Sequence, residues 1–273
     1  MKKIAIIAVA IVFVCTGLAA AQSNIQGAVI NKSNVAGSAN VAAGVGNAAN
    51  LGTADIEKSN VKGAVINQSN VAGSANVAAG VGNTANMGST QIKNSNVQGA
   101  VINKSNVAGS ANVAAGVGNT ANMGSTQIQG SNVKGAVINQ SNVAGSANVA
   151  AGVGNTANMG ATQIKNANVQ GAVINQGNVK GSANVAAGVG NTANMASTQI
   201  QGANVQGAVI NKSNVAGSAN VAAGVGNTAN MGAVQIKGGN VKGAVINQSN
   251  VAGSANVAAG VGNTANMGSV VIK

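Results

Sequence analysis

The sequence repeats itself every 36 residues. The string Gly-Ala-Val-Ile-Asn begins at Gly27 and recurs at this fixed interval, at Gly63, Gly99, Gly135, Gly171, Gly207 and Gly243. Residues 22–273 hold seven such units with nothing left over: 22–57, 58–93, 94–129, 130–165, 166–201, 202–237 and 238–273. A repeat of this length is typical of chains whose units stack on one another, because one unit alone cannot bury its apolar face. Positions are counted from 1 to 36 within each unit below.

Within each unit, large apolar residues recur at even positions. In unit 58–93 we expect these residues to form the apolar core: Val61, Val65, Val71, Val77, Val81 and Met87. Odd positions carry most of the Asn, Gln and Lys, and this period of two is typical of strands. The many Gly and Asn residues disfavour helices. We therefore predict an all-β fold, a β-solenoid or cross-β stack of the seven repeats.

The number of layers in each repeat has two possible values. The pair Asn60–Val61 in the first half of a unit recurs 16 residues later as Asn76–Val77. Halves related by 16 and then 20 residues do not form an even coil, so we predict one layer per repeat. Seven layers stand ~34 Å tall at the usual strand spacing, whereas the alternative of two layers per repeat gives ~67 Å.

Six asparagines recur in all seven units. In unit 58–93 they are Asn60, Asn67, Asn70, Asn76, Asn83 and Asn86. Stacked copies of a unit place each Asn over the same Asn, so that side-chain amides bond along the stack as ladders. Asn67 and Asn83 interrupt the alternation, which indicates a corner or an inward ladder. For the pairs Asn67–Asn70 and Asn83–Asn86, a role in turns is an equal alternative.

The lysines are spaced as a stack requires. Position 5 reads Gln26, Lys62, Gln98, Lys134, Gln170, Gln206 and Lys242, and position 11 reads Lys32, Gln68, Lys104, Gln140, Gln176, Lys212 and Gln248. Neither column has Lys in two consecutive units. With strands ~4.8 Å apart, an intervening Gln doubles the separation of like charges and weakens their repulsion. This phasing favours an ordered stack over a disordered chain.

The last unit closely matches the interior units and ends at Lys273 without a polar cap. Such an end leaves a strand edge that can template another copy. Stacked head to tail, two copies keep the Lys/Gln alternation across the joint, with Glu57 between Lys93 of its own chain and Lys273 of the neighbour. The residues that we predict to meet at this joint are Gln26, Lys32, Glu57, Lys242, Gln248 and Lys273.

Residues 1–21 differ from the repeats. A basic start is followed by a short apolar run and by three alanines that end at Ala21. This order is typical of a bacterial secretory signal peptide, with cleavage between Ala21 and Gln22. The alternative, a retained membrane anchor, is disfavoured because the run is short. The predicted cleavage site coincides with the start of the first unit, and we expect a secreted protein.

The composition excludes most chemistry. The chain has no His, and its two acidic residues are Asp55 and Glu57. General acid–base catalysis and metal binding need several such groups together, so we predict no enzyme, no cofactor and no metal. A column of Thr at position 27 leaves ice binding as an alternative function. The net charge of +12 leaves binding to anionic polysaccharide or extracellular DNA as another.

The segment from Gly73 to Asn86, GSANVAAGVGNTAN, resembles the Asn-Val-Ala-Ala-Gly-x-Gly-Asn core of Fap-type functional amyloid subunits. The spaced Asn, Gln and Gly more loosely resemble curli repeats. The resemblance implies export through an outer-membrane secretion apparatus and assembly into extracellular biofilm fibres at the bacterial cell surface. Unlike the main Fap fibre subunit, this chain has no long linkers and no C-terminal Cys-x-x-Cys, which leaves open whether it is a major or a nucleating subunit.

We therefore expect a secreted structural subunit that polymerises with itself, head to tail, into functional amyloid fibres of the biofilm matrix. The alternative is a soluble repeat-solenoid binding protein whose ligand is ice or a polyanion.

Overall fold

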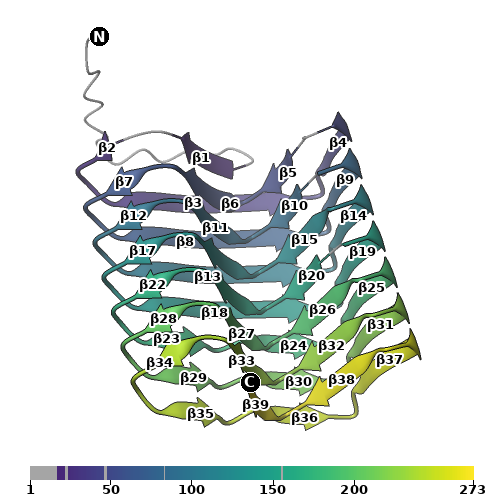
Figure 1. The fold of residues 1–273 in the computed structure, drawn as a ribbon. Helices are drawn as coiled ribbons and strands as arrows, with labels where there is room; N and C mark the ends of the chain where they lie inside the picture. The colour runs from purple at the N-terminus through teal and green to yellow at the C-terminus, as the bar shows by residue number, and fades with distance from the viewer. Residues whose placement is uncertain (1–16, 22–23, 46–47, 83, 155) are drawn as a thin grey trace.

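The protein is an all-β solenoid whose turns stack in parallel along one axis (Figure 1). The structure is a computed structural model that describes residues 17–21, 24–45, 48–82, 84–154 and 156–273. Each 36-residue repeat forms one turn, because each residue pairs with the residue 36 positions away: Val101 lies between Val65 and Val137. One layer per repeat is therefore confirmed, and the alternative of two layers is wrong.

Each turn contributes one segment to each of five parallel sheets. The β2–β34 sheet holds β2 (Asn24–Ile25), β7 (Asn60–Val61), β12 (Asn96–Val97), β17 (Asn132–Val133), β22 (Asn168–Val169), β28 (Asn204–Val205) and β34 (Asn240–Val241). The β3–β36 sheet holds β3 (Val29–Ala36), β8 (Val65–Ala72), β13 (Val101–Ala108), β18 (Val137–Ala144), β23 (Val173–Asn175), β24 (Asn178–Lys180), β29 (Val209–Asn211), β30 (Asn214–Ala216), β35 (Val245–Asn247) and β36 (Asn250–Ala252). In the last three turns two short strands replace the single long strand of this sheet.

The other three sheets complete the turn. The β4–β37 sheet holds β4 (Ala39–Val45), β9 (Ala75–Val81), β14 (Ala111–Val117), β19 (Ala147–Val153), β25 (Ala183–Val189), β31 (Ala219–Val225) and β37 (Ala255–Val261). The β5–β38 sheet holds β5 (Ala48–Leu51), β10 (Thr84–Met87), β15 (Thr120–Met123), β20 (Thr156–Met159), β26 (Thr192–Met195), β32 (Thr228–Met231) and β38 (Thr264–Met267). The β1–β39 sheet holds β1 (Gly17–Ala21), β6 (Thr53–Glu57), β11 (Thr90–Lys93), β16 (Thr126–Gln129), β21 (Thr162–Lys165), β27 (Thr198–Gln201), β33 (Val234–Lys237) and β39 (Val270–Ile272).

The core consists of three stripes that run along the stack. In unit 58–93, Val61 and Val65 pack in the stripe of Ile92, and Val71 packs in the stripe of Met87. The third stripe is made of alanines from the β4–β37 and β5–β38 sheets. The predicted core residues Val61, Val65, Val71 and Met87 are fully buried.

Val77 and Val81 were predicted in the core, and this prediction is wrong. Val77 is half-buried on the outer face of β9, and Val81 is 50% exposed there. The alternation changes phase at a bend before β9, so that this strand buries Asn76 and Ala78 instead. Ala78 packs in the same stripe as Ala85 of β10, and every buried member of that stripe is an alanine.

Two glycines near the end of β14 show why the repeat needs this residue. Gly116 has φ 130°, and a Cβ atom built on it would lie 1.8 Å from the carbonyl oxygen of Gly80 in the turn before. Gly118 has φ 67° but faces open space. The first glycine allows two layers to touch through their backbones, whereas the second only supplies a left-handed bend.

The 36-residue register extends beyond the first unit. Strand β1 pairs with β6 from Gly17↔Thr53 to Ala21↔Glu57, within the segment that the sequence assigns to a signal peptide. The rest of that segment, and Gln22 of the predicted cleavage site, lie outside the described residues. In the part of the chain that the structure describes, no helix is long and apolar enough to span a membrane.

Candidate assembly surfaces

Three of the six predicted asparagine columns form continuous ladders in the interior. At position 10 the Nδ2 atom of Asn67 donates to Oδ1 of Asn103 at 2.9 Å, and at position 19 Asn76 donates in the same way to Asn112 at 2.9 Å. These side chains are fully buried. The amide of Asn76 also donates to the backbone oxygen of Asn86 at 2.9 Å. Burying these amides therefore leaves their hydrogen bonds satisfied along the stack.

The ladders do not all point the same way. At positions 10 and 19 each amide donates toward the C-terminal end of the stack. At position 29 the direction is reversed, since Asn86 donates to Asn50 at 3.1 Å and Asn122 donates to Asn86 at 2.8 Å. Each end of the solenoid therefore presents both amide donors and amide acceptors.

The outer columns at positions 13 and 3 are weaker. Asn70 is exposed and donates to Asn34 at 3.1 Å, a pattern that continues along position 13. At position 3, Asn60 donates to Asn24 at 3.4 Å, and the Oδ1 atoms of Asn132 and Asn168 are buried without a hydrogen-bond partner. The position-3 ladder is therefore interrupted in the later turns.

The sixth column, at position 26, does not form a side-chain ladder where it is described. Asn83 itself lies outside the described residues. Its equivalent Asn119 donates through Nδ2 to the backbone oxygens of Ala115 at 2.6 Å and Gly80 at 3.2 Å. This column therefore holds a bend in place, which is the role in turns that the sequence left open.

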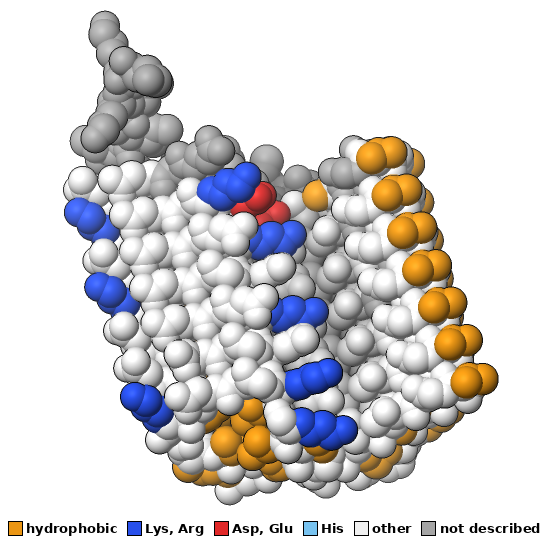
Figure 2. Space-filling model, viewed as in Figure 1, with side chains coloured by type: hydrophobic (Ala, Val, Ile, Leu, Met, Phe, Trp, Pro, Cys, Tyr) orange, Lys and Arg blue, Asp and Glu red, His pale blue; other side chains and the backbone are white. Residues whose placement is uncertain are grey.

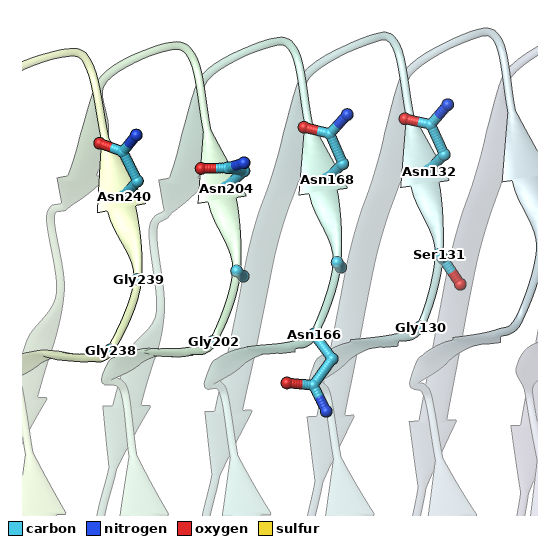
Figure 3. Close-up of a pocket in the computed structure, with 12 residues that line it drawn as sticks. Gly130, Ser131, Asn132, Asn166, Asn168, Gly202, Asn204, Gly238, Gly239 and Asn240 are labelled. Atoms are coloured by element: carbon cyan, nitrogen blue, oxygen red, sulfur yellow. The ribbon is translucent and has the colours of Figure 1, made fainter.

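A shallow groove of about 710 Å³ follows positions 1 to 3 along the last four turns. Figure 3 shows the amides of Asn132, Asn168, Asn204 and Asn240 in a row along it. The other lining residues are Gly130, Ser131, Asn166, Ala167, Gly202, Ala203, Gly238 and Gly239. The side chains that line the groove are neutral, so none of them is an acid or a base.

Strand pairing separates the lysines as the sequence predicted. Lys104 of β13 lies between Gln68 and Gln140 of the adjacent turns. At position 36, Lys165 lies between Gln129 and Gln201, and its burial lowers the pKa of its amine. Figure 2 shows the basic side chains as spaced rows along the stack. The solenoid therefore carries its positive charge in rows whose neighbouring members are mostly glutamines.

The two acidic residues lie together on β6. Glu57 pairs in register with Lys93 of β11, as predicted, and its Oε1 lies 3.8 Å from Nζ of Lys58. The Lys58 contact was not predicted. Burial raises the pKa of the Asp55 carboxyl, nearby Lys93 lowers it, and Glu57 raises it further. The first layer is thus the one place where negative charge offsets a lysine row.

The last turn ends with its core exposed. Met267 is 44% exposed whereas Met231 in the turn before is fully buried, and Ile272 is 65% exposed whereas Ile236 is 2% exposed. The other predicted joint residues divide between the two ends: Gln26, Lys32 and Glu57 lie in the first turn, and Lys242, Gln248 and Lys273 lie in the last turn. They do not meet within one chain.

Sequence reasoning missed the apolar outer face of the β4–β37 sheet. A period of two does not show whether the odd or the even positions face inward after a bend.

No protein-family model, no curated protein and no solved structure matches this chain. Its function must therefore be inferred from its own geometry.

Proposed function

We propose that the protein is a secreted structural subunit that assembles head to tail into extracellular functional amyloid fibres of the biofilm matrix or cell surface. The observation that supports this most is the exposed core of the turn that holds Met267 and Ile272. Every interior layer covers the layer before it in register, and Met267 and Ile272 have no such cover. A second copy that continues the register supplies it, because its first layer has the same strands in the same order.

The interior of such a joint is complementary. Met267 meets Leu51 of the next copy, which occupies the same position 30. The position-10 ladder continues when Asn247 donates to Asn31 of the next copy. The position-29 ladder runs the other way, so Asn50 of that copy donates to Asn266. The joint therefore repeats the contacts that hold any two layers together.

The rim of the joint is complementary as well. Glu57 is paired with Lys93 on one side within its own chain, and Ala21 of β1 pairs with it on the other side. Strand β1 lies in the predicted signal peptide, so cleavage after Ala21 frees this edge of β6 for Lys273 of the neighbour. At position 5, Lys242 meets Gln26, and at position 11, Gln248 meets Lys32. Exposed charge pairs of this kind contribute no more than about 1 kcal/mol each, so they align the joint and the apolar core stabilises it.

The resemblance to Fap-type subunits and the predicted signal peptide support a route through an outer-membrane secretion apparatus. A fibre built from this solenoid has strands perpendicular to its long axis, spaced ~4.8 Å apart, and its subunits repeat every ~34 Å along that axis. Both spacings are measurable by fibre diffraction and by imaging.

The decisive experiment places a charge in the joint. In a single chain the side chain of Ile272 is already mostly exposed, so Ile272→Lys costs the subunit little. In a fibre the same lysine lies in the apolar stripe, where an unpaired charge is strongly unfavourable. We expect Ile272→Lys to abolish fibre growth, as followed by light scattering and electron microscopy.

The matched control is Ala252→Lys, which adds the same charge to the same layer at an exposed outer position. We expect it to grow like the unmodified chain. Equal growth of both variants would contradict head-to-tail assembly.

The alternative function is a soluble solenoid that binds ice or a polyanion. The row of Thr84 and its equivalents, half-buried at position 27 of the interior turns, and the lysine rows are the features that favour it. It predicts a chain that stays monomeric and gives thermal hysteresis or salt-sensitive binding to DNA. Fibres with the two spacings above contradict it.

A further inference from the structure

The outer face of the β4–β37 sheet is entirely apolar. In β9 the outward side chains are Ala75, Val77, Ala79 and Val81, and the same four residue types recur in every turn. Val81 is 50% exposed, and at the two ends Val45 is 80% and Val261 72% exposed. Figure 2 shows the row of hydrophobic side chains along one edge of the stack. We refer to these outward alanines and valines as the valine face.

The valine face is also free of charge. No Lys, Asp or Glu occurs in any strand of the β4–β37 sheet or of the adjoining β5–β38 sheet. The lysines of the repeats occupy positions 1, 5, 11, 15 and 36, which lie in the other three sheets or in the bends beside them. Two chains of net charge +12 therefore approach each other with least repulsion through this face.

The size of the valine face fits a specific contact. Seven strands span about 34 Å along the stack, and the seven residues of each strand span about 20 Å across it. The face therefore offers about 700 Å² to a flat partner, close to the roughly 800 Å² that each partner buries in a standard interface. Exposed apolar patches of this size mark interaction surfaces in soluble proteins.

We propose that the valine face binds the valine face of a second copy, so that two solenoids lie side by side with parallel or antiparallel axes. Small side chains let two sheets approach to about 10 Å, the distance at which alanines and valines interdigitate. A partner must present a row every ~4.8 Å to match all seven layers, and a second copy does so. The contact is self-complementary, as in a twofold dimer.

This lateral contact does not depend on head-to-tail assembly. It uses an outward face, whereas the joint uses the first and last turns. The pair can therefore form between two growing fibres or between two soluble chains, and the two proposals can fail separately.

The test compares two triple-lysine variants of the full chain. Val81→Lys, Val153→Lys and Val225→Lys together add three charges to the valine face in alternate layers. The control variant carries Ala36→Lys, Ala108→Lys and Ala252→Lys, which add three charges at position 15. Together with the natural Lys180, these lysines also lie in alternate layers. Mass per length is measured by scanning transmission electron microscopy of the fibres.

We expect two chains per ~34 Å of fibre for the unmodified chain and for the control, and one chain for the valine-face variant. One chain per ~34 Å in the unmodified fibre, or two in the valine-face variant, would overturn the proposal. The far-UV circular dichroism spectrum shows whether the valine-face variant keeps its β-sheet structure. If it does not fold, Val153→Lys alone is compared with Ala108→Lys alone. If the chain forms no fibres, sedimentation equilibrium decides: a dimer of the 25.8-kDa chain supports the contact and a monomer overturns it.

Discussion

The Nδ2 atom of Asn139 lies 2.9 Å from Oδ1 of Asn175, one full turn further along the chain. The same amide of Asn139 accepts at 2.9 Å from Asn103 in the turn before. All three side chains are fully buried. A buried amide thus joins three layers, and each neighbouring amide makes one ladder hydrogen bond with it.

We expect Asn139→Ala to lower the free energy of unfolding by about 2–4 kcal/mol, since the buried amides of Asn103 and Asn175 each lose a ladder hydrogen bond. Asn142→Ala on the same strand is the control. Asn142 makes the equivalent contacts with Asn106 and Asn178 at 3.1 Å, but it is exposed, so water replaces them. We expect that variant to cost about 0.5 kcal/mol. Denaturant unfolding of both variants measures the difference, and equal losses would contradict the importance of the buried ladder.

Gly116 and Gly118 should differ sharply when replaced by alanine. The Cβ atom of Gly116→Ala would overlap the carbonyl oxygen of Gly80, so two layers must separate. We expect a loss of at least about 3 kcal/mol. The Cβ atom of Gly118→Ala contacts no other atom, so only the left-handed backbone conformation disfavours this variant. We expect its free energy of unfolding to fall by about 1 kcal/mol. Thermal unfolding of the two variants tests the contrast, and similar melting temperatures would show that the layers are not in backbone contact there.

Two threonines at position 33 should respond in opposite directions to valine. The Oγ1 atom of Thr126 is buried without a partner, whereas that of Thr162 lies 3.2 Å from Oδ1 of Asn175. Position 33 is already Val234, fully buried in the core, in a later turn. We expect Thr126→Val to raise the free energy of unfolding by about 1 kcal/mol and Thr162→Val to lower it by a similar amount. Destabilisation by both variants would mean that the Thr126 hydroxyl is bonded.

The Asp55 carboxyl makes stability depend on pH. Because burial raises its pKa above the unfolded value, the folded state binds its proton more tightly. The stabilising effect of that proton is complete below the unfolded pKa and is lost as pH rises through the folded one. Asp55→Asn carries no charge, so we expect it to melt at a higher temperature than the unmodified chain at pH 7 and at the same temperature at pH 3. A difference that is larger at pH 3 would contradict this sign.

Glu57→Lys should slow fibre growth. The new lysine would face Lys93 in its own chain and Lys273 of the neighbour, in place of two attractive pairs. If the joint loses about 1 kcal/mol of interaction free energy, the rate of fibre elongation falls about fivefold at low salt. Near 1 M NaCl the charges are screened and the rate recovers. Glu57→Gln should give an intermediate rate. Growth unaffected by Glu57→Lys at low salt would remove Glu57 from the joint.

The repeat length predicted the stack and the pairing of each residue with its copy, and the uneven offsets of the two half-units predicted a single layer per repeat. These follow because identical residues at a fixed interval can satisfy one another only when they lie side by side. Buried ladders such as those of Asn67 and Asn76 result from this in-register pairing, and the sequence had already marked Asn67 as an inward candidate. The apolar stripe of Val61, Val65 and Ile92 follows the same register.

The outward placement of Val77 and Val81 could not be predicted in the same way. A bend that contains one more or one fewer residue exchanges the inward and outward positions of the next strand. The alternation of apolar and polar residues does not reveal how many residues the bend contains. Asn76 takes the inner place because its amide is satisfied by the layers on either side, which removes the usual penalty for a buried polar group. Ala78, two residues further along, packs with Ala85 in the buried alanine stripe.

The register of 36 residues also determines how this chain can change in length. Deleting any 36 consecutive residues from the interior brings together two segments that already match, so every ladder and stripe is restored and the molecule is one layer shorter. Deleting 35 residues shifts each later strand by one place and turns its inward asparagines and valines to the outside. Recombination between copies therefore yields shorter or longer molecules with unchanged ends, whereas almost any other insertion or loss is disruptive.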